Sequence, residues 1–138
     1  MSPLVSTSRR RLYRPAADVA GAIASGACAL HCAAMPFAAM VLPAAAARVF
    51  AGEGVHALLA GLVVATSLAA FVPGWLRHGD LRVWKWALAG LGLILFARLA
   101  GTADLGVAGE ALVTTAGGGL LLVAHRLNHS LAYWSDKL

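Results

Sequence analysis

The chain has 138 residues, of which 60% are apolar and only 12% are charged. Soluble domains carry about twice that charged fraction, so the composition excludes an ordinary soluble domain, a disulfide-rich secreted scaffold and a disordered tail. The net charge of +5 does not indicate a nucleic-acid partner, because the basic residues lie at the edges of apolar runs. The composition predicts a membrane protein whose main partner is the lipid bilayer.

Four apolar runs follow a flexible, basic lead at residues 1–15. They cover approximately residues 16–42, 56–76, 83–103 and 105–124, and each is long enough to cross a bilayer at about 20 residues per crossing. A cleaved signal peptide is disfavoured, because the first run is too long for one and contains Asp18. We therefore expect an all-α polytopic membrane protein, a bundle of four transmembrane helices at 16–130 with a short C-terminal tail at 131–138.

The basic residues also predict the orientation of the bundle. Most of them flank the ends of the runs on the side of the N-terminus: four arginines in the lead, three bases around residues 77–85, and Arg126 and Lys137. The opposite side has only Arg48 and Arg98. Since basic residues accumulate on the cytoplasmic side, both termini are expected in the cytoplasm.

The two cysteines, Cys28 and Cys32, lie in the first run with His31 between them. Positions spaced i, i+3 and i+4 share one face of a helix, and this depth is near the bilayer midplane. Helical spacing disfavours a disulfide but lets both thiols reach one soft ion. Pro36 leaves the carbonyl of Cys32 without its helical partner. The alternative is that the cysteines pack as small apolar residues and His31 bonds a neighbouring helix.

A second group of candidate ligands ends the fourth run. His125 and His129 are spaced i, i+4 and could together bind a borderline ion such as zinc; the alternative is that they cap the helix end. His56, with Glu53, could receive an ion at the opposite end, although a capping role is favoured. No catalytic triad, phosphate loop or carboxylate pair can be assembled, so we expect neither an enzyme nor a resident cofactor.

Taken together, these residues resemble the MerC family of mercury-transport proteins. The resemblance rests on Asp18, the segment 28–32 with Pro36, the Arg77-His78 pair and the segment 124–128 after a glycine-rich run, and it covers about residues 16–130. It implies a four-span bacterial inner-membrane protein that takes up mercury(II) through the first-span cysteines. Resistance-operon members resemble a relay with a second cysteine pair near the C-terminus, where this chain has only His125 and His129, so zinc and copper stay open beside mercury.

Three functions follow as hypotheses. The first is metal-ion uptake, with the ion bound by Cys28, His31 and Cys32 and released near His125 and His129. The second is a structural or accessory subunit of a larger membrane complex, in which the cluster only packs. The third, a redox protein that cycles the two cysteines, is disfavoured by their helical spacing. A homo-oligomer or a larger assembly is compatible with any of them.

Overall fold

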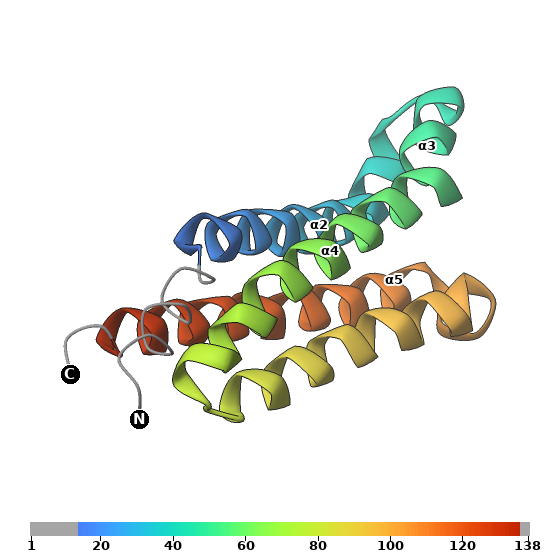
Figure 1. Ribbon diagram of the computed structural model, residues 1–138. Helices are drawn as coiled ribbons and strands as arrows, with labels where there is room; N and C mark the ends of the chain where they lie inside the picture. Colours follow the sequence, from blue (N-terminus) through green and yellow to red (C-terminus); the bar gives the residue numbers. More distant parts are fainter. Residues whose placement is uncertain (1–13, 136–138) are drawn as a thin grey trace.

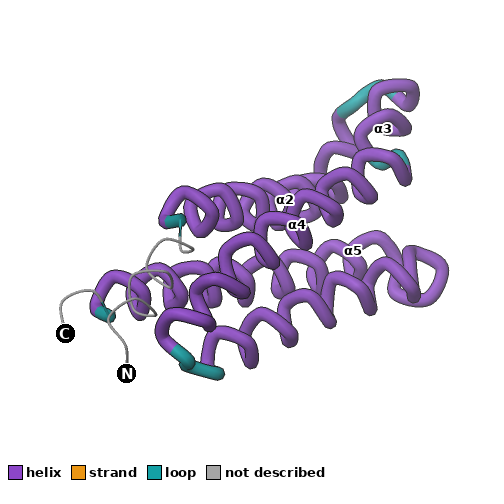
Figure 2. Tube along the Cα trace, viewed as in Figure 1, coloured by secondary structure: helices purple, strands orange, loops and turns teal. Residues whose placement is uncertain are grey.

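A computed structural model describes residues 14–135, and all regular secondary structure in that range is helical (Figures 1 and 2). The lead predicted at 1–15 lies outside the described residues except for its last two positions, as do the last three residues of the predicted tail. The elements are α2 (Pro15–Val41), α3 (Ala44–Phe50), α4 (Glu53–His78) and α5 (Arg82–Trp134).

Helix α2 corresponds to the first apolar run, and its ends follow from local chemistry. Pro15 occupies the first turn, where its missing N–H costs nothing and its fixed φ favours the helix. Leu42 adopts an extended conformation (φ −83°, ψ 146°), as expected of a residue that precedes a proline, here Pro43. Pro36 lies inside the helix and leaves the carbonyl of Cys32 without an intrahelical N–H donor.

Helix α5 reverses direction within its length and forms two limbs (Figure 1). Gly101 and Gly106 have φ of 64° and 69° with ψ near 180°, a conformation that essentially only glycine adopts. The first limb, residues 82–100, packs against the second, residues 107–134. A Cβ at Gly117 would lie 2.8 Å from the carbonyl oxygen of Gly90, so the glycines let the limbs approach closely.

Three helical segments are long and apolar enough to cross a membrane: Pro15–Val41, Ala44–His78 and Arg82–Trp134. The sequence analysis expected four, because it treated residues 83–103 and 105–124 as separate spans. Both runs lie within the range of α5, one in each limb, and the backbone leaves helical geometry between them at Gly101 and Gly106. The short helix α3 was not predicted. None of its residues is buried, so its sequence lacks the periodic apolar positions by which a packed helix is recognised.

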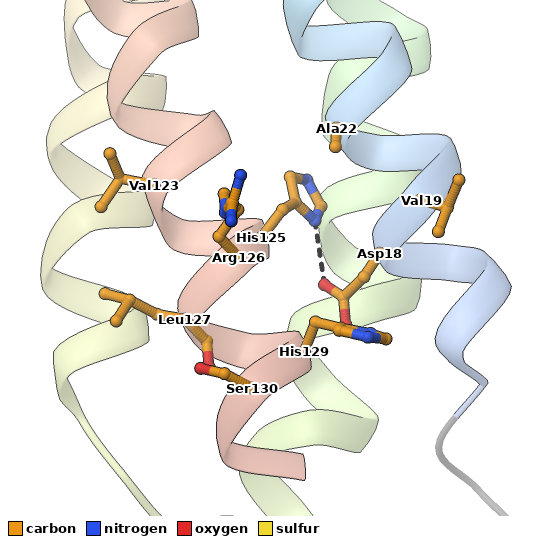
Figure 3. Close-up of a pocket in the computed structure, with 9 residues that line it drawn as sticks. All are labelled: Asp18, Val19, Ala22, Val123, His125, Arg126, Leu127, His129 and Ser130. Atoms are coloured by element: carbon orange, nitrogen blue, oxygen red, sulfur yellow. Dashed lines mark hydrogen bonds and ion pairs between the residues drawn. The ribbon is translucent and has the colours of Figure 1, made fainter. Parts of the chain in front are cut away.

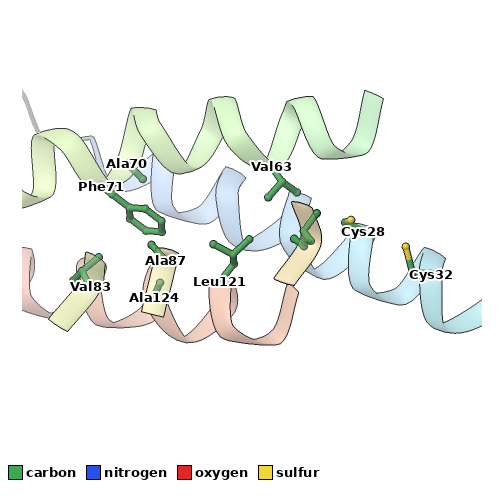
Figure 4. Close-up of a cluster of buried hydrophobic side chains, with 10 residues drawn as sticks. Cys28, Cys32, Val63, Ala70, Phe71, Val83, Ala87, Leu121 and Ala124 are labelled. Atoms are coloured by element: carbon green, nitrogen blue, oxygen red, sulfur yellow. The ribbon is translucent and has the colours of Figure 1, made fainter. Parts of the chain in front are cut away.

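Apolar side chains lie both inside and outside the bundle. Buried residues of α2, α4 and both limbs of α5 form one cluster around Phe71 and Leu121, with Cys28 and Cys32 at one end (Figure 4). Many large apolar side chains are exposed, among them Ile23, Leu30 and Phe37 of α2. This exposed apolar surface is what a bilayer covers.

Candidate metal-ion site

The site begins with the two thiols of α2. Cys28 and Cys32 are 4% and 7% exposed, form no disulfide, and are both among the buried residues of α2. This places them on one helix face, as their spacing of four residues predicts. The pair therefore places two soft sulfur donors in the interior, one helical turn apart.

The buried face of α2 is unusual in its chemistry. It consists of small, polar or sulfur-containing residues only: Asp18, Gly21, Ser25, Cys28, Ala29 and Cys32. The hydroxyl oxygen of Ser25 has no hydrogen-bond partner within the described residues. Small residues at a helix interface are ordinary packing in a membrane bundle, but two thiols and a buried hydroxyl without a partner are not required for it.

His31 does not join the thiols. Its Nε2 lies 3.2 Å from the carbonyl oxygen of Phe50, and its ring meets the ring of His56 edge-on with centroids 5.3 Å apart. It therefore connects α2 to the region of α3 and the start of α4. Within residues 14–135, no three histidine, cysteine, aspartate or glutamate side chains are close enough together to hold one metal ion.

A cavity of about 440 Å³ lies at this end of the bundle, with Cys32 in its wall; we call it the Cys32 cavity. Its polar lining also includes Glu53, His56, Arg98, Glu110 and Thr114. The guanidinium of Arg98 donates to the carboxylate of Glu53 at 2.7 Å and lies 3.6 Å from that of Glu110. The cavity thus connects one thiol to a charged mouth built from α4 and both limbs of α5.

A buried polar cluster, here called the Asp18 network, occupies the opposite end of the bundle. The carboxylate of Asp18, 2% exposed, accepts a hydrogen bond from Nδ1 of His125 at 3.0 Å and one from Nδ2 of Asn128 at 2.8 Å. The same Asn128 amide donates to the backbone carbonyl of Ala70 at 3.1 Å. These bonds join α2, α4 and the second limb of α5 at one point.

Two further side chains of α4 extend the Asp18 network. Nε2 of His78 lies 3.0 Å from Oδ1 of Asn128, and Oγ of Ser67 lies 3.5 Å from Nε2 of His125. The backbone N–H of Asp80 donates to Nδ1 of His78, so the proton of a neutral His78 ring is on Nε2, directed at Asn128. A Cβ at Gly21 would overlap the imidazole of His125, and one at Gly74 the amide of Asn128.

His125 and His129 lie one turn apart on α5 but differ in exposure to solvent. His125 is buried and points at Asp18, whereas His129 is exposed (Figure 3). Both line a groove of about 660 Å³ between α2 and α5, beside Asp18 and Arg126. The structure therefore gives His125 a partner in α2 and places both imidazoles in the wall of one groove.

Sequence reasoning located the cysteines and His125 but missed the Asp18 network and the Cys32 cavity. The available signal for the network was the presence of Asp18 in an apolar run, since an intramembrane carboxylate requires a partner. Its partners lie 107 and 110 residues away in the chain, and nothing local identifies them. Arg98 and Glu110 likewise belong to no sequence pattern that would identify them as neighbours in the fold.

The comparisons with known proteins bear on the same residues. The family model of the MerC mercury resistance protein matches residues 18–130. The chain belongs to the MerC family. Its membership makes it a multi-pass membrane protein of a transport and resistance family, and the matched range contains both cysteines and the side chains of the Asp18 network. Neither the curated proteins nor the solved structures gave a match.

Removing the carboxylate of Asp18 should destabilise this MerC-family protein strongly. In Asp18→Ala the buried His125 and Asn128 lose their shared acceptor, and breaking such a buried pair costs about 3 kcal/mol or more. The loss should appear as a lower unfolding temperature in detergent. Asp104→Ala, which removes an exposed carboxylate of the same helical bundle, is the control and should leave the temperature unchanged; equal effects of both changes would show that the network contributes nothing specific.

Proposed function

We propose that this MerC-family protein takes up a soft metal ion, mercury(II) first of all, by binding it between Cys28 and Cys32. Family membership supports mercury as the ion. The observation that carries the proposal is the buried face of α2, where two thiols and an unpartnered hydroxyl lie on the same side of the helix. Polar groups at this depth are costly to bury and are typically functional.

The number and kind of donors favour particular ions. Thiolates select soft ions, and two sulfur donors are enough for an ion that accepts few ligands, such as mercury(II) or Cu(I). A structural zinc site requires four ligands, whereas His31 bonds to Phe50 and leaves the thiols as a pair. Zinc is therefore a weaker candidate at Cys28 and Cys32 than mercury or copper. Binding releases the thiol protons.

The polar residues of α2 outline a route. An ion in the Cys32 cavity meets Cys32 first, then Cys28 one turn further along, then Ser25. At about 1.5 Å of rise per residue these steps are roughly 6 Å and 4.5 Å, short enough for transfer without free diffusion in the apolar core. The Asp18 network closes the far end, so release requires its helices to separate there. His125 and His129, at that end, stay the predicted exit ligands.

The same proposal includes a topology. At about 1.5 Å per residue, the 53 residues of α5 would reach about 80 Å as one straight helix, far beyond a hydrocarbon core of about 30 Å. The reversal at Gly101 and Gly106 supports two crossings by α5 and four in all. The distribution of basic residues supports an inner-membrane protein with both termini in the cytoplasm and the Cys32 cavity facing outward.

Reporter fusions test this topology. Fusions after Gly79 and at the C-terminus should report a cytoplasmic location, because most basic residues lie on that side of the membrane. Fusions after Ala51 and Ala103 should report an external location. A cytoplasmic signal from the fusion after Ala103, beside a cytoplasmic signal after Gly79, would contradict a double crossing by α5.

Serine substitutions test the metal site. Cys28→Ser, Cys32→Ser and the double variant should each lose most of the affinity for mercury(II), and each single change should be nearly as damaging as both, because one ion shares the two thiolates. Mercury(II) affinity of the detergent-purified proteins is the measurement, with competition by a small thiol. Affinity should also fall at acidic pH, since protons compete for the sulfurs.

Thr66→Ala is the control, because it removes a hydroxyl that bonds only to the backbone of its own helix, α4, and no thiol. It should keep the mercury affinity of the wild type. Mercury binding retained in the folded double serine variant would contradict the proposal and favour the structural-subunit alternative.

A further inference from the structure

Two ligand-type side chains in the Cys32 cavity lack hydrogen-bond partners. His56 makes only the ring contact with His31, and no side chain or carbonyl within residues 14–135 bonds to its ring nitrogens. Glu110 is only 17% exposed, and its one ionic partner among those residues is Arg98 at 3.6 Å, beyond hydrogen-bonding distance. The imidazole of His56 and the carboxylate of Glu110 are therefore two donors in the wall of one cavity that neighbouring side chains leave available to a cation.

Arg98 is a weak partner for Glu110 because it is engaged elsewhere. Its shorter contact, 2.7 Å, is to Glu53, whose side chain is 89% exposed and so is well solvated without it. One guanidinium between two carboxylates leaves the mouth of the cavity with a net charge of about −1. This charge attracts a cation, and Glu110 is the carboxylate that water solvates least.

We propose that His56 and Glu110 form a receiving site for a hydrated divalent cation in the Cys32 cavity, one step before the thiols. The proposal rests on the function proposed above and adds a second, weaker position to it. One imidazole nitrogen and one carboxylate bind the ion while water completes its shell, which agrees with the absence of a three-ligand cluster in the described range. A borderline ion such as zinc accepts both donors.

The receiving site and the thiol pair have different donors, and an ion that enters the protein needs both kinds in turn. A hydrated ion cannot enter the apolar interior without losing its water, and nitrogen and oxygen donors in the cavity replace part of that shell before Cys32 does. The guanidinium of Arg98 lies only 3.6 Å from the carboxylate of Glu110. The arriving ion competes with this guanidinium, which keeps its bond to Glu53.

Zinc binding to a thiol-free protein tests the site apart from the cysteines. In the Cys28→Ser/Cys32→Ser protein, one zinc ion should still bind. Adding Glu110→Gln or His56→Ala should weaken that binding at least about tenfold, the lower end of what the loss of even an outer-shell partner costs. Asp104→Asn, an exposed carboxylate outside the cavity lining, is the matched control and should leave zinc affinity unchanged.

The variant Arg98→Gln gives a second measurement, in which zinc affinity should change in the opposite direction. It should raise zinc affinity about tenfold, because it removes a like charge within about 10 Å of the bound ion, whereas a purely structural arginine would only destabilise the fold. Zinc binding that is absent from the thiol-free protein, or that is indifferent to Glu110 and His56, would overturn the receiving site. Neither result would affect mercury binding by the cysteines, so failure of this inference is distinguishable from failure of the proposed function.

Discussion

The carboxylate of Asp18 is the constraint on which the arrangement of the bundle depends. A buried carboxylate in an apolar bundle is tolerated only where donors meet it, and here they come from His125 and Asn128, more than 100 residues away. Satisfying it therefore brings the start of α2 against the end of α5. The further bond from Asn128 to Ala70 brings α4 to the same point.

This constraint fixes the rotation of α2 about its axis, and through it the position of the thiols. Residues 18, 25, 28 and 32 follow the helical repeat closely enough to share one stripe, so directing Asp18 inward directs Cys28 and Cys32 inward as well. The aliphatic residues of α2 then face lipid, where they are favourable. A membrane helix can in this way expose its apolar side chains and reserve its buried face for chemistry, which a helix in water cannot do.

The sequence predicted what local periodicity and charge encode. The all-helical class, the membrane location and the shared face of Cys28 and Cys32 follow from apolar runs and from a spacing of four. His31 was grouped with the thiols on spacing alone; at 100° per residue it lies about 60° from Cys28 and about 100° from Cys32, at the edge of that face, and the structure turns it toward Phe50.

What the sequence did not reveal depends on distant contacts. The Asp18 network and the pairing of Arg98 with Glu53 and Glu110 join residues of different helices, and no local pattern encodes such contacts. The reversal between the two limbs of α5 does have a local signal, since Gly101 and Gly106 mark a turn. It falls where the sequence separates the third and fourth apolar runs.

The central claim is that Cys28 and Cys32 bind one ion together. X-ray absorption at the metal edge of the protein loaded with one equivalent of mercury(II) tests it most directly, because this spectrum counts sulfur neighbours around the ion. The account predicts two sulfur neighbours in the wild type and none in the Cys28→Ser/Cys32→Ser protein. A spectrum with a single sulfur neighbour, or with only nitrogen and oxygen around the ion, would contradict it.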